Sequence, residues 1–186
     1  MKQNPKESHK TQNPSKDSRM LTAMFSDRKS SENAYNTLQE RGYTKDDINL
    51  VMSDDTRKKH FTGAAKQTEI GTKAAEGVGK GSAIGGTVGA VAGVVAAIGT
   101  SIVIPGLGVI IAGPIAAGLA GAGAGGITGG VIGALVGSGI PEARAKLYES
   151  GIKEGNIVMG VHPRNREDAK FLENNWRTNS GTEIYS

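Results

Sequence analysis

Short apolar runs mark the predicted strands at both ends of the chain. Residues 20–25 and 48–52 lie near the start, and residues 157–161 lie near the end. Continuous apolar runs of this length are typical of buried β-strands. Residues 183–185 form a fourth, shorter run that predicts a final strand.

The segment between the first two runs carries its apolar residues at helical spacing. Residues 28–41 place Tyr35 and Leu38 on one face and charged residues elsewhere, which is typical of an amphipathic helix. Asp27 is suited to cap its N-terminus, and Gly42 is suited to end it. These ~35 residues therefore predict a strand, a helix and a second strand, which together form a βαβ unit.

The closing part of the chain repeats this order. Pro141 opens a polar helix over residues 142–153, which leads into the third strand. Asn165 is suited to cap a last helix over residues 166–177. Two such halves predict an α+β fold with a small ferredoxin-like sheet.

A stretch without any charged residue, Gly81 to Pro141, separates the two halves. Small residues recur there at every fourth position, which places them on one stripe of a helix and allows close helix packing. The first series is Gly77, Gly81, Gly85, Gly89, Gly93 and then Ala97. The second series is Gly113, Ala117, Gly121, Gly125, Gly129, Gly133 and Gly137.

Two stripes separated by a Pro-Gly turn predict an antiparallel glycine-zipper helical hairpin. The first helix would run through Ala83 to Ile104, long enough to cross a hydrocarbon core of ~30 Å at ~1.5 Å per residue. The second would begin at Pro114 and end near Ser138. The most apolar residues would form its tip: Ile102, Ile104, Pro105, Gly106, Leu107, Ile110 and Ile111.

These patterns divide the chain into four parts. Residues 1–19 are polar and basic, and we expect a disordered tail. Residues 20–56 form the first half of the α+β domain, and residues 141–186 form the second half. Residues 57–140 are predicted to be a charged helix that leads into the glycine-zipper hairpin.

Composition narrows the function. The chain has 28 glycines, no cysteine and a formal net charge of +4. Without cysteine, disulfides, thiolate metal sites and cysteine nucleophiles are excluded. The basic surplus lies in the tail and the rest is nearly balanced, so we expect no nucleic-acid partner. The polar N-terminus predicts no secretory signal peptide.

We find no constellation that predicts catalysis, a metal or a cofactor. His9, His60 and His162 stand alone, without neighbouring ligands at metal-binding spacing. Residues 77–82 resemble a phosphate-binding loop but lack its first glycine and its Ser/Thr after the lysine. Calcium binding at residues 54–55 is a weaker interpretation than local capping by Asp. No small-molecule substrate is indicated, and an enzyme is the least favoured class.

Four segments at the two ends of the chain carry a resemblance to a known family: Leu21–Asp27, Glu40–Tyr43, Asp47–Ser53 and Lys146–Gly155. In their order and spacing they resemble a bacterial general stress protein (heat-induced stress protein) family, over residues 20–56 and 141–177. The resemblance implies a stress-linked, non-enzymatic protein, and it carries no functional residue with it.

Two functions remain open for the hairpin. In the first, it inserts into a membrane and packs with itself or with other copies, with both termini and the α+β domain cytoplasmic. Its length and its apolar tip favour lipid. The basic residues on both flanks are expected if both ends stay cytoplasmic. In the second, the protein is a soluble cytoplasmic homo-oligomeric scaffold that assembles through the zipper. The missing aromatic belt and the many glycines favour this alternative, because they make insertion marginal.

Overall fold

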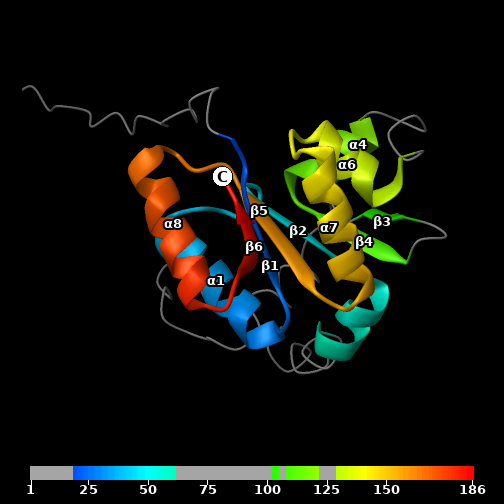
Figure 1. Cartoon of the computed structure of the whole chain (residues 1–186), viewed down its shortest axis with the longest axis horizontal. Helices are drawn as coiled ribbons and strands as arrows, with labels where there is room; N and C mark the ends of the chain where they lie inside the picture. Colours follow the sequence, from blue (N-terminus) through cyan, green and yellow to red (C-terminus); the bar gives the residue numbers. More distant parts are fainter. Residues whose placement is uncertain (1–18, 62–101, 105–107, 122–128) are drawn as a thin grey trace, which may run out of the picture.

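The fold is a β-sheet with helices on both faces (Figure 1). The computed structural model describes residues 19–61, 102–104, 108–121 and 129–186. The strands are β1 (Leu21–Phe25), β2 (Ile48–Ser53), β3 (Ile102–Ile104), β4 (Val109–Ala112), β5 (Ile157–Val161) and β6 (Thr182–Tyr185). The helices are α1 (Arg28–Glu40), α4 (Pro114–Gly121), α6 (Gly130–Gly137), α7 (Glu142–Lys153), α8 (Arg166–Thr178) and a further helix over residues 54–61.

The described strands form one sheet of six strands in the order β3-β4-β2-β5-β1-β6. All the neighbouring pairs are antiparallel. The two halves of the sequence interleave, because β5 lies between β2 and β1. Leu21 of β1 and Ile48 of β2 both face Val161 of β5, so the third apolar run joins the first two.

Alternation along the strands sends every second side chain to the same face. On the first face, α1 and α8 cover the sheet, and their buried Tyr35, Leu38 and Trp176 pack against Phe25 and Leu50. The ring of Phe25 meets that of Trp176 edge to face, with 6.0 Å between the centroids. This arrangement fits the predicted amphipathic helices.

On the second face, α4, α6 and α7 cover the same strands. Ile115, Leu135 and Tyr148 come from these three helices and share a core with Val51 and Val158 of the sheet. Figure 1 shows the two helical layers on opposite sides of the strands. The structure is therefore a three-layer sandwich, and the α+β class is confirmed.

Most elements in the two ends begin and end close to their predicted positions. Asp27 caps α1 by accepting a hydrogen bond from the Ser30 N–H at 2.8 Å. Asn165 caps α8 through the Asp168 N–H, also at 2.8 Å. Gly42, which follows α1, has φ of +81°, a conformation that glycine adopts readily.

The prediction of a helical hairpin with a free apolar tip is wrong, because the residues on both sides of the predicted turn form β-strands. Ile102 and Ile104 lie in β3, so the first predicted helix does not extend to Ile104. Ile110 and Ile111 lie in β4, where they are 3% and 0% exposed, and not at a free tip. Residues 105–107, the predicted turn with Pro105, Gly106 and Leu107, lie outside the described residues.

The prediction of one continuous second helix is also wrong. The helix begins at Pro114 as expected, but α4 ends at Gly121 and α6 begins only at Gly130. Gly130 has φ of +59°, in the left-handed region. One right-handed helix therefore cannot run from Pro114 to Ser138.

The predicted boundary at residue 140 does not separate two bodies. Residues of β4, α4 and α6 pack into the same second-face core as α7 and β5. Most of the predicted disordered tail lies outside the described residues, which begin at residue 19. Most of the first predicted zipper helix also lies outside them, because residues 62–101 are not described. Among the helices that the structure describes, none is long and apolar enough to cross a membrane.

Candidate functional site

An apolar groove with a volume of about 540 Å³ lies between α4 and α6. The two helices contribute small residues to it, and Met20, just before β1, and His162, just after β5, also line it. We call it the glycine groove. Its lining residues include Met20, Ile115, Leu119, Gly118, Gly133 and Gly137.

The glycines of this groove leave space where other residues would have side chains. A Cβ built on Gly118, Gly133 or Gly137 would meet no atom within 4 Å. Gly133 and Gly137 are one helical turn apart on α6, so both contribute bare backbone to one stripe. Without side chains at these positions, another helix can approach the backbone of α6 closely.

The structure brings together only part of the predicted zipper. Gly129, Gly133 and Gly137 of the second series line the groove, and Gly121 is the last residue of α4. Gly113 has another role: its φ is +95°, and a Cβ there would clash with the backbone of Ile48. Gly77, Gly81, Gly85, Gly89, Gly93 and Gly125 lie outside the described residues.

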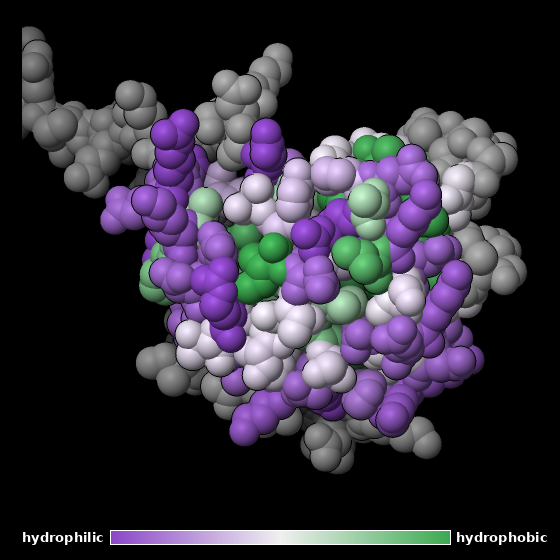
Figure 2. Space-filling view, viewed as in Figure 1, coloured by the Kyte–Doolittle hydropathy of each residue, from purple (hydrophilic) through white to green (hydrophobic). Residues whose placement is uncertain are grey.

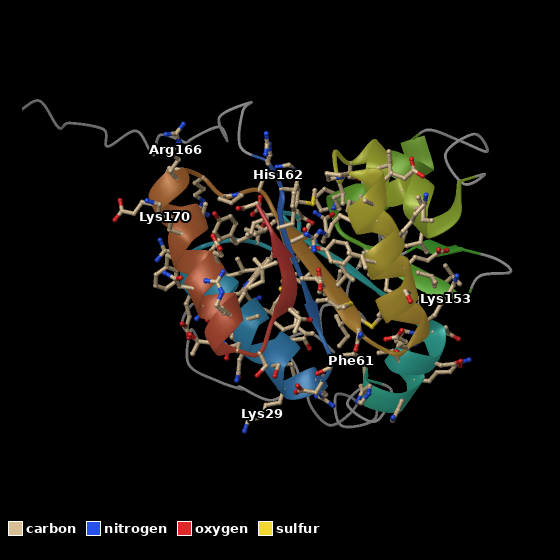
Figure 3. All side chains as sticks on the ribbon, in the orientation of Figure 1. Lys29, Phe61, Lys153, His162, Arg166 and Lys170 are labelled. Carbon is tan, nitrogen blue, oxygen red and sulfur yellow. The ribbon has the colours of Figure 1, made fainter. Side chains whose placement is uncertain are left out.

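Most of the lining residues were missed by the sequence reasoning, among them Gly118, Met20 and His162. Gly118 falls outside the four-residue series, yet it faces the groove from α4. Met20 and His162 come from the two ends of the chain and line the groove because β1 and β5 are neighbours. Figure 3 shows His162 at the upper end of the sheet, between the two helical layers. Only the strand pairing identifies these two residues, and no local pattern marks them.

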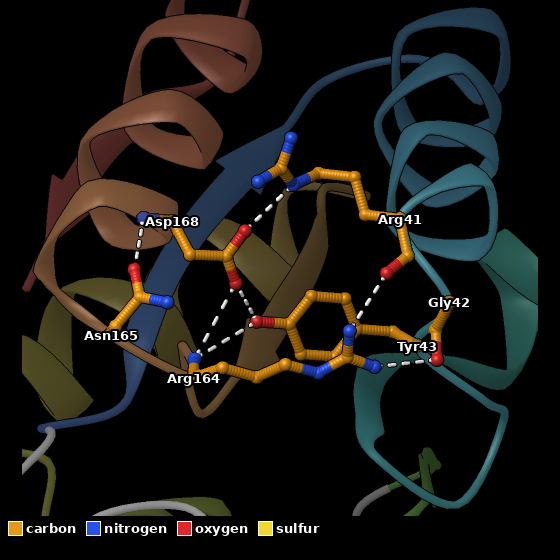
Figure 4. Close-up of polar contacts among 6 residues, drawn as sticks. All are labelled: Arg41, Gly42, Tyr43, Arg164, Asn165 and Asp168. Atoms are coloured by element: carbon orange, nitrogen blue, oxygen red, sulfur yellow. Dashed lines mark hydrogen bonds and ion pairs between the residues drawn. The ribbon is translucent and has the colours of Figure 1, made fainter. Parts of the chain in front are cut away.

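A second concentration of polar groups joins the end of α1 to the start of α8 (Figure 4). The Asp168 carboxylate is buried and accepts hydrogen bonds from Arg41 Nε at 2.6 Å and from the Tyr43 hydroxyl. Arg164 donates to the carbonyls of Arg41, at 2.8 Å, and Gly42, at 2.6 Å. Its guanidinium lies 4.3 Å from the centre of the Tyr43 ring. We call this set the Asp168 cluster.

The charges in the Asp168 cluster are matched. Burial by itself raises the pKa of the Asp168 carboxyl, but the hydrogen bonds from Tyr43 and Arg41 outweigh it and hold this pKa below 3.8. Burial, with the neighbouring Asp168, raises the pKa of Tyr43. Each polar side chain has a partner within the cluster, so the arrangement fixes the two halves together and leaves no group poised for chemistry.

A polar cleft of about 440 Å³ lies beside the helix over residues 54–61. Lys59 and Lys153 line it together with the carboxylates Asp55 and Glu154, so its charge is balanced. Asp54, considered above for calcium, is paired with Arg57 at 2.8 Å and Lys58 at 2.6 Å. Within the described residues, no three His, Asp or Glu side chains are grouped to hold a metal ion.

Comparison with known proteins adds no further constraint. No family model, no curated protein and no solved structure matches this chain.

Proposed function

We propose that this protein is a non-enzymatic assembly module, linked to the stress response, whose working surface is the glycine groove. The groove would receive an apolar helix rich in small residues from another copy of the chain. The stress link rests on the sequence resemblance described above. The assembly role rests on the geometry of the groove.

The observation that carries this proposal is the open space at Gly118, Gly133 and Gly137. Glycine destabilises a helix by ~1 kcal/mol relative to alanine. These glycines therefore weaken α4 and α6, although a larger side chain would meet no atom there. A docked helix would offset that cost, since bare backbone permits contact along a full turn. The first glycine series, residues 77–97, has the composition and spacing that such a groove fits.

The proposal is tested by filling the groove with a side chain. Gly133→Leu adds bulk where a Cβ meets nothing, and leucine favours the helix by ~1 kcal/mol. We expect this variant to fold at least as stably as the parent and to lose self-association, measured by light scattering over a range of concentrations.

A matched control lies on the same helix. Val136 is 42% exposed and does not line the groove, so Val136→Leu should assemble like the parent. If Gly133→Leu also assembles like the parent, the groove is not the assembly surface.

Membrane association is the second candidate, and the charge-free run from Gly81 to Pro141 favours it. Parts of that run, residues 81–101, 105–107 and 122–128, lie outside the described residues. In this arrangement both termini would be cytoplasmic. Fractionation decides this candidate. A membrane protein would sediment with lipid and require detergent, whereas recovery in the supernatant in plain buffer would exclude the anchor.

We further propose that the two ends of the chain form a ferredoxin-like unit. The strand order β2-β5-β1-β6 supports this assignment. So do the helices α1 and α8, which follow β1 and β5 and pack on the same face. Residues 54–156 would then be an insertion that adds two strands and the second helical layer.

A further inference from the structure

Strand β6 pairs with its neighbour β1 over a short and irregular ladder. Thr22 faces Tyr185 and Met24 faces Thr182, and the register shifts between these two pairs. The first two residues of β6 are exposed, and its last two are only partly buried. The strands β1, β2 and β5, in contrast, are almost fully buried. Ladder and burial therefore support β6 less than they support these strands.

Side chains of α7 supply a second set of contacts to β6. Glu183 forms an ion pair with Arg144, whose guanidinium also lies 5.6 Å from the centre of the Tyr185 ring. The hydroxyl of the buried Tyr148 donates a hydrogen bond to the Glu183 carbonyl at 2.7 Å. Figure 2 shows hydrophilic side chains between β6 and α7. Arg144, Tyr148 and Glu183 connect β6 to α7, and we call them the α7 clamp.

The segment that contains β6 has a left-handed backbone at two residues that are not glycine. Ser180 has φ of +59°, and Glu183 has φ of +49°. Ser180 directly follows the C-cap of α8, where glycine is the usual residue. The left-handed conformation is unfavourable for a residue with a side chain, because its Cβ crowds the backbone. Such a conformation persists where surrounding contacts hold it, and at Glu183 these contacts are the α7 clamp.

A buried polar group next to the same segment lacks a partner. Within the described part of the chain, Trp176 Nε1 is buried and has no hydrogen-bond partner. The Trp176 carbonyl accepts a hydrogen bond from the Gly181 N–H at 2.7 Å, and Ile184 packs against the core that contains Trp176. A buried donor without a partner is unfavourable. Water that enters when Ile184 leaves this core would satisfy it.

We propose that residues 180–185 form a strap that opens locally while the rest of the sheet stays folded, and that the α7 clamp controls this opening. Opening releases the left-handed backbone, lets water reach Trp176 Nε1 and exposes the edge of β1 that faces β6. Such an edge presents unpaired backbone groups with which another strand can pair. None of these residues lines the glycine groove, so the strap is independent of the proposed self-association.

Amide hydrogen exchange of the parent protein in increasing urea tests whether the strap opens by itself. We expect the β6 amides to exchange at least about tenfold faster than the β5 amides and with little dependence on urea, because a local opening exposes little surface. The indole N–H of Trp176, the single tryptophan of the chain, should exchange with the β6 amides. Exchange of β6 and β5 at one rate with one urea dependence would overturn the strap.

A pair of variants tests the clamp. Arg144→Gln removes the ion pair with Glu183 and the contact with the Tyr185 ring, and leaves the buried Tyr148 in place. Lys146→Gln is the matched control, because it removes an ion pair with Glu142 from the same helix. We expect Arg144→Gln to speed exchange of the β6 amides by about threefold or more, and Lys146→Gln to leave it near the parent rate. Equal rates in the two variants would show that the clamp does not control the strap.

A third variant acts in the opposite direction on the backbone of the strap. Ser180→Gly keeps the α7 clamp and places at this position the residue that adopts a left-handed backbone readily. The closed strap becomes more favourable, so we expect the β6 amides to exchange about threefold more slowly than in the parent. An unchanged or faster rate would contradict the role of the left-handed backbone in opening.

Discussion

At the scale of single residues, the Asp168 carboxylate joins two segments that are far apart in the chain. Arg41 and Tyr43 follow α1, whereas Asp168 lies in the first turn of α8. Arg41 also stacks on the half-exposed Phe171 ring, with 4.0 Å to its centre. These contacts fix one end of α1 against one end of α8 on the first face of the sheet.

The pKa of Asp168 gives this cluster a pH dependence. Its folded pKa is below the ordinary 3.8, so the unfolded state binds the proton more readily. The stabilisation is therefore present above pH ~4 and is lost as the pH falls through the folded pKa. We expect the cluster to hold at neutral pH and to weaken in acid.

The first prediction is that Asp168→Asn destabilises the fold by about 2 kcal/mol at pH 7, because charge-assisted hydrogen bonds are lost. The difference from the parent should shrink below pH ~4, where the parent carboxylate becomes protonated. Urea unfolding at several pH values measures both effects. Asp46→Asn removes an exposed carboxylate and should cost no more than ~0.5 kcal/mol. A constant difference at all pH values would contradict the assigned role of the charge.

At the scale of elements, Asn49 explains how α4 is attached to the sheet. Asn49 is the second residue of the apolar strand β2 and is 2% exposed. Its side-chain oxygen accepts a hydrogen bond from the Ile115 N–H at 2.8 Å, which satisfies one free donor at the start of α4. Gly113 makes the turn before α4 and lies close to the Ile48 backbone.

The second prediction is that Asn49→Ala destabilises the protein by about 1–2 kcal/mol, the usual cost of a lost N-terminal cap. The buried Ile115 N–H would then lack its partner. Thermal or urea unfolding measures the change. Asn33→Ala, at an exposed site on α1, is the control and should remain within ~0.5 kcal/mol of the parent. Equal stability of Asn49→Ala and the parent would show that the cap is dispensable.

The elements also show where sequence patterns were sufficient and where they were not. Caps such as Asp27 and Asn165 act within three residues, so their sequence positions located α1 and α8. The four-residue glycine period indicated a helix but carries no information about its continuity, and Gly130 breaks it. The β-branched runs around Pro105 and Gly106 are equally typical of a β-hairpin. Contacts such as Arg41 with Asp168 depend on tertiary packing and left no local signal.

At the scale of the whole molecule, the sheet couples two hydrophobic cores. The strands contribute alternate side chains to both, so Leu50 packs under α1 and α8 while Val51 packs under α4, α6 and α7. The sequence predicted a small domain with a separate hairpin. The structure instead places β4, α4 and α6 within the same fold. A single cooperative unfolding transition is expected for a domain with shared strands.

The third prediction tests this coupling with the chain's single tryptophan. Trp176 is fully buried in the first core, and Leu135 is 1% exposed in the second core. Leu135→Ala should lower the free energy of unfolding by about 2–5 kcal/mol. Trp176 fluorescence should report that loss although its own core is unaltered. Leu147→Ala, at a side chain that is 49% exposed on α7, should change it by no more than ~0.5 kcal/mol. If α4 and α6 formed an independent appendage, Leu135→Ala would leave the Trp176 transition unchanged, and circular dichroism would show a separate, earlier loss of helix.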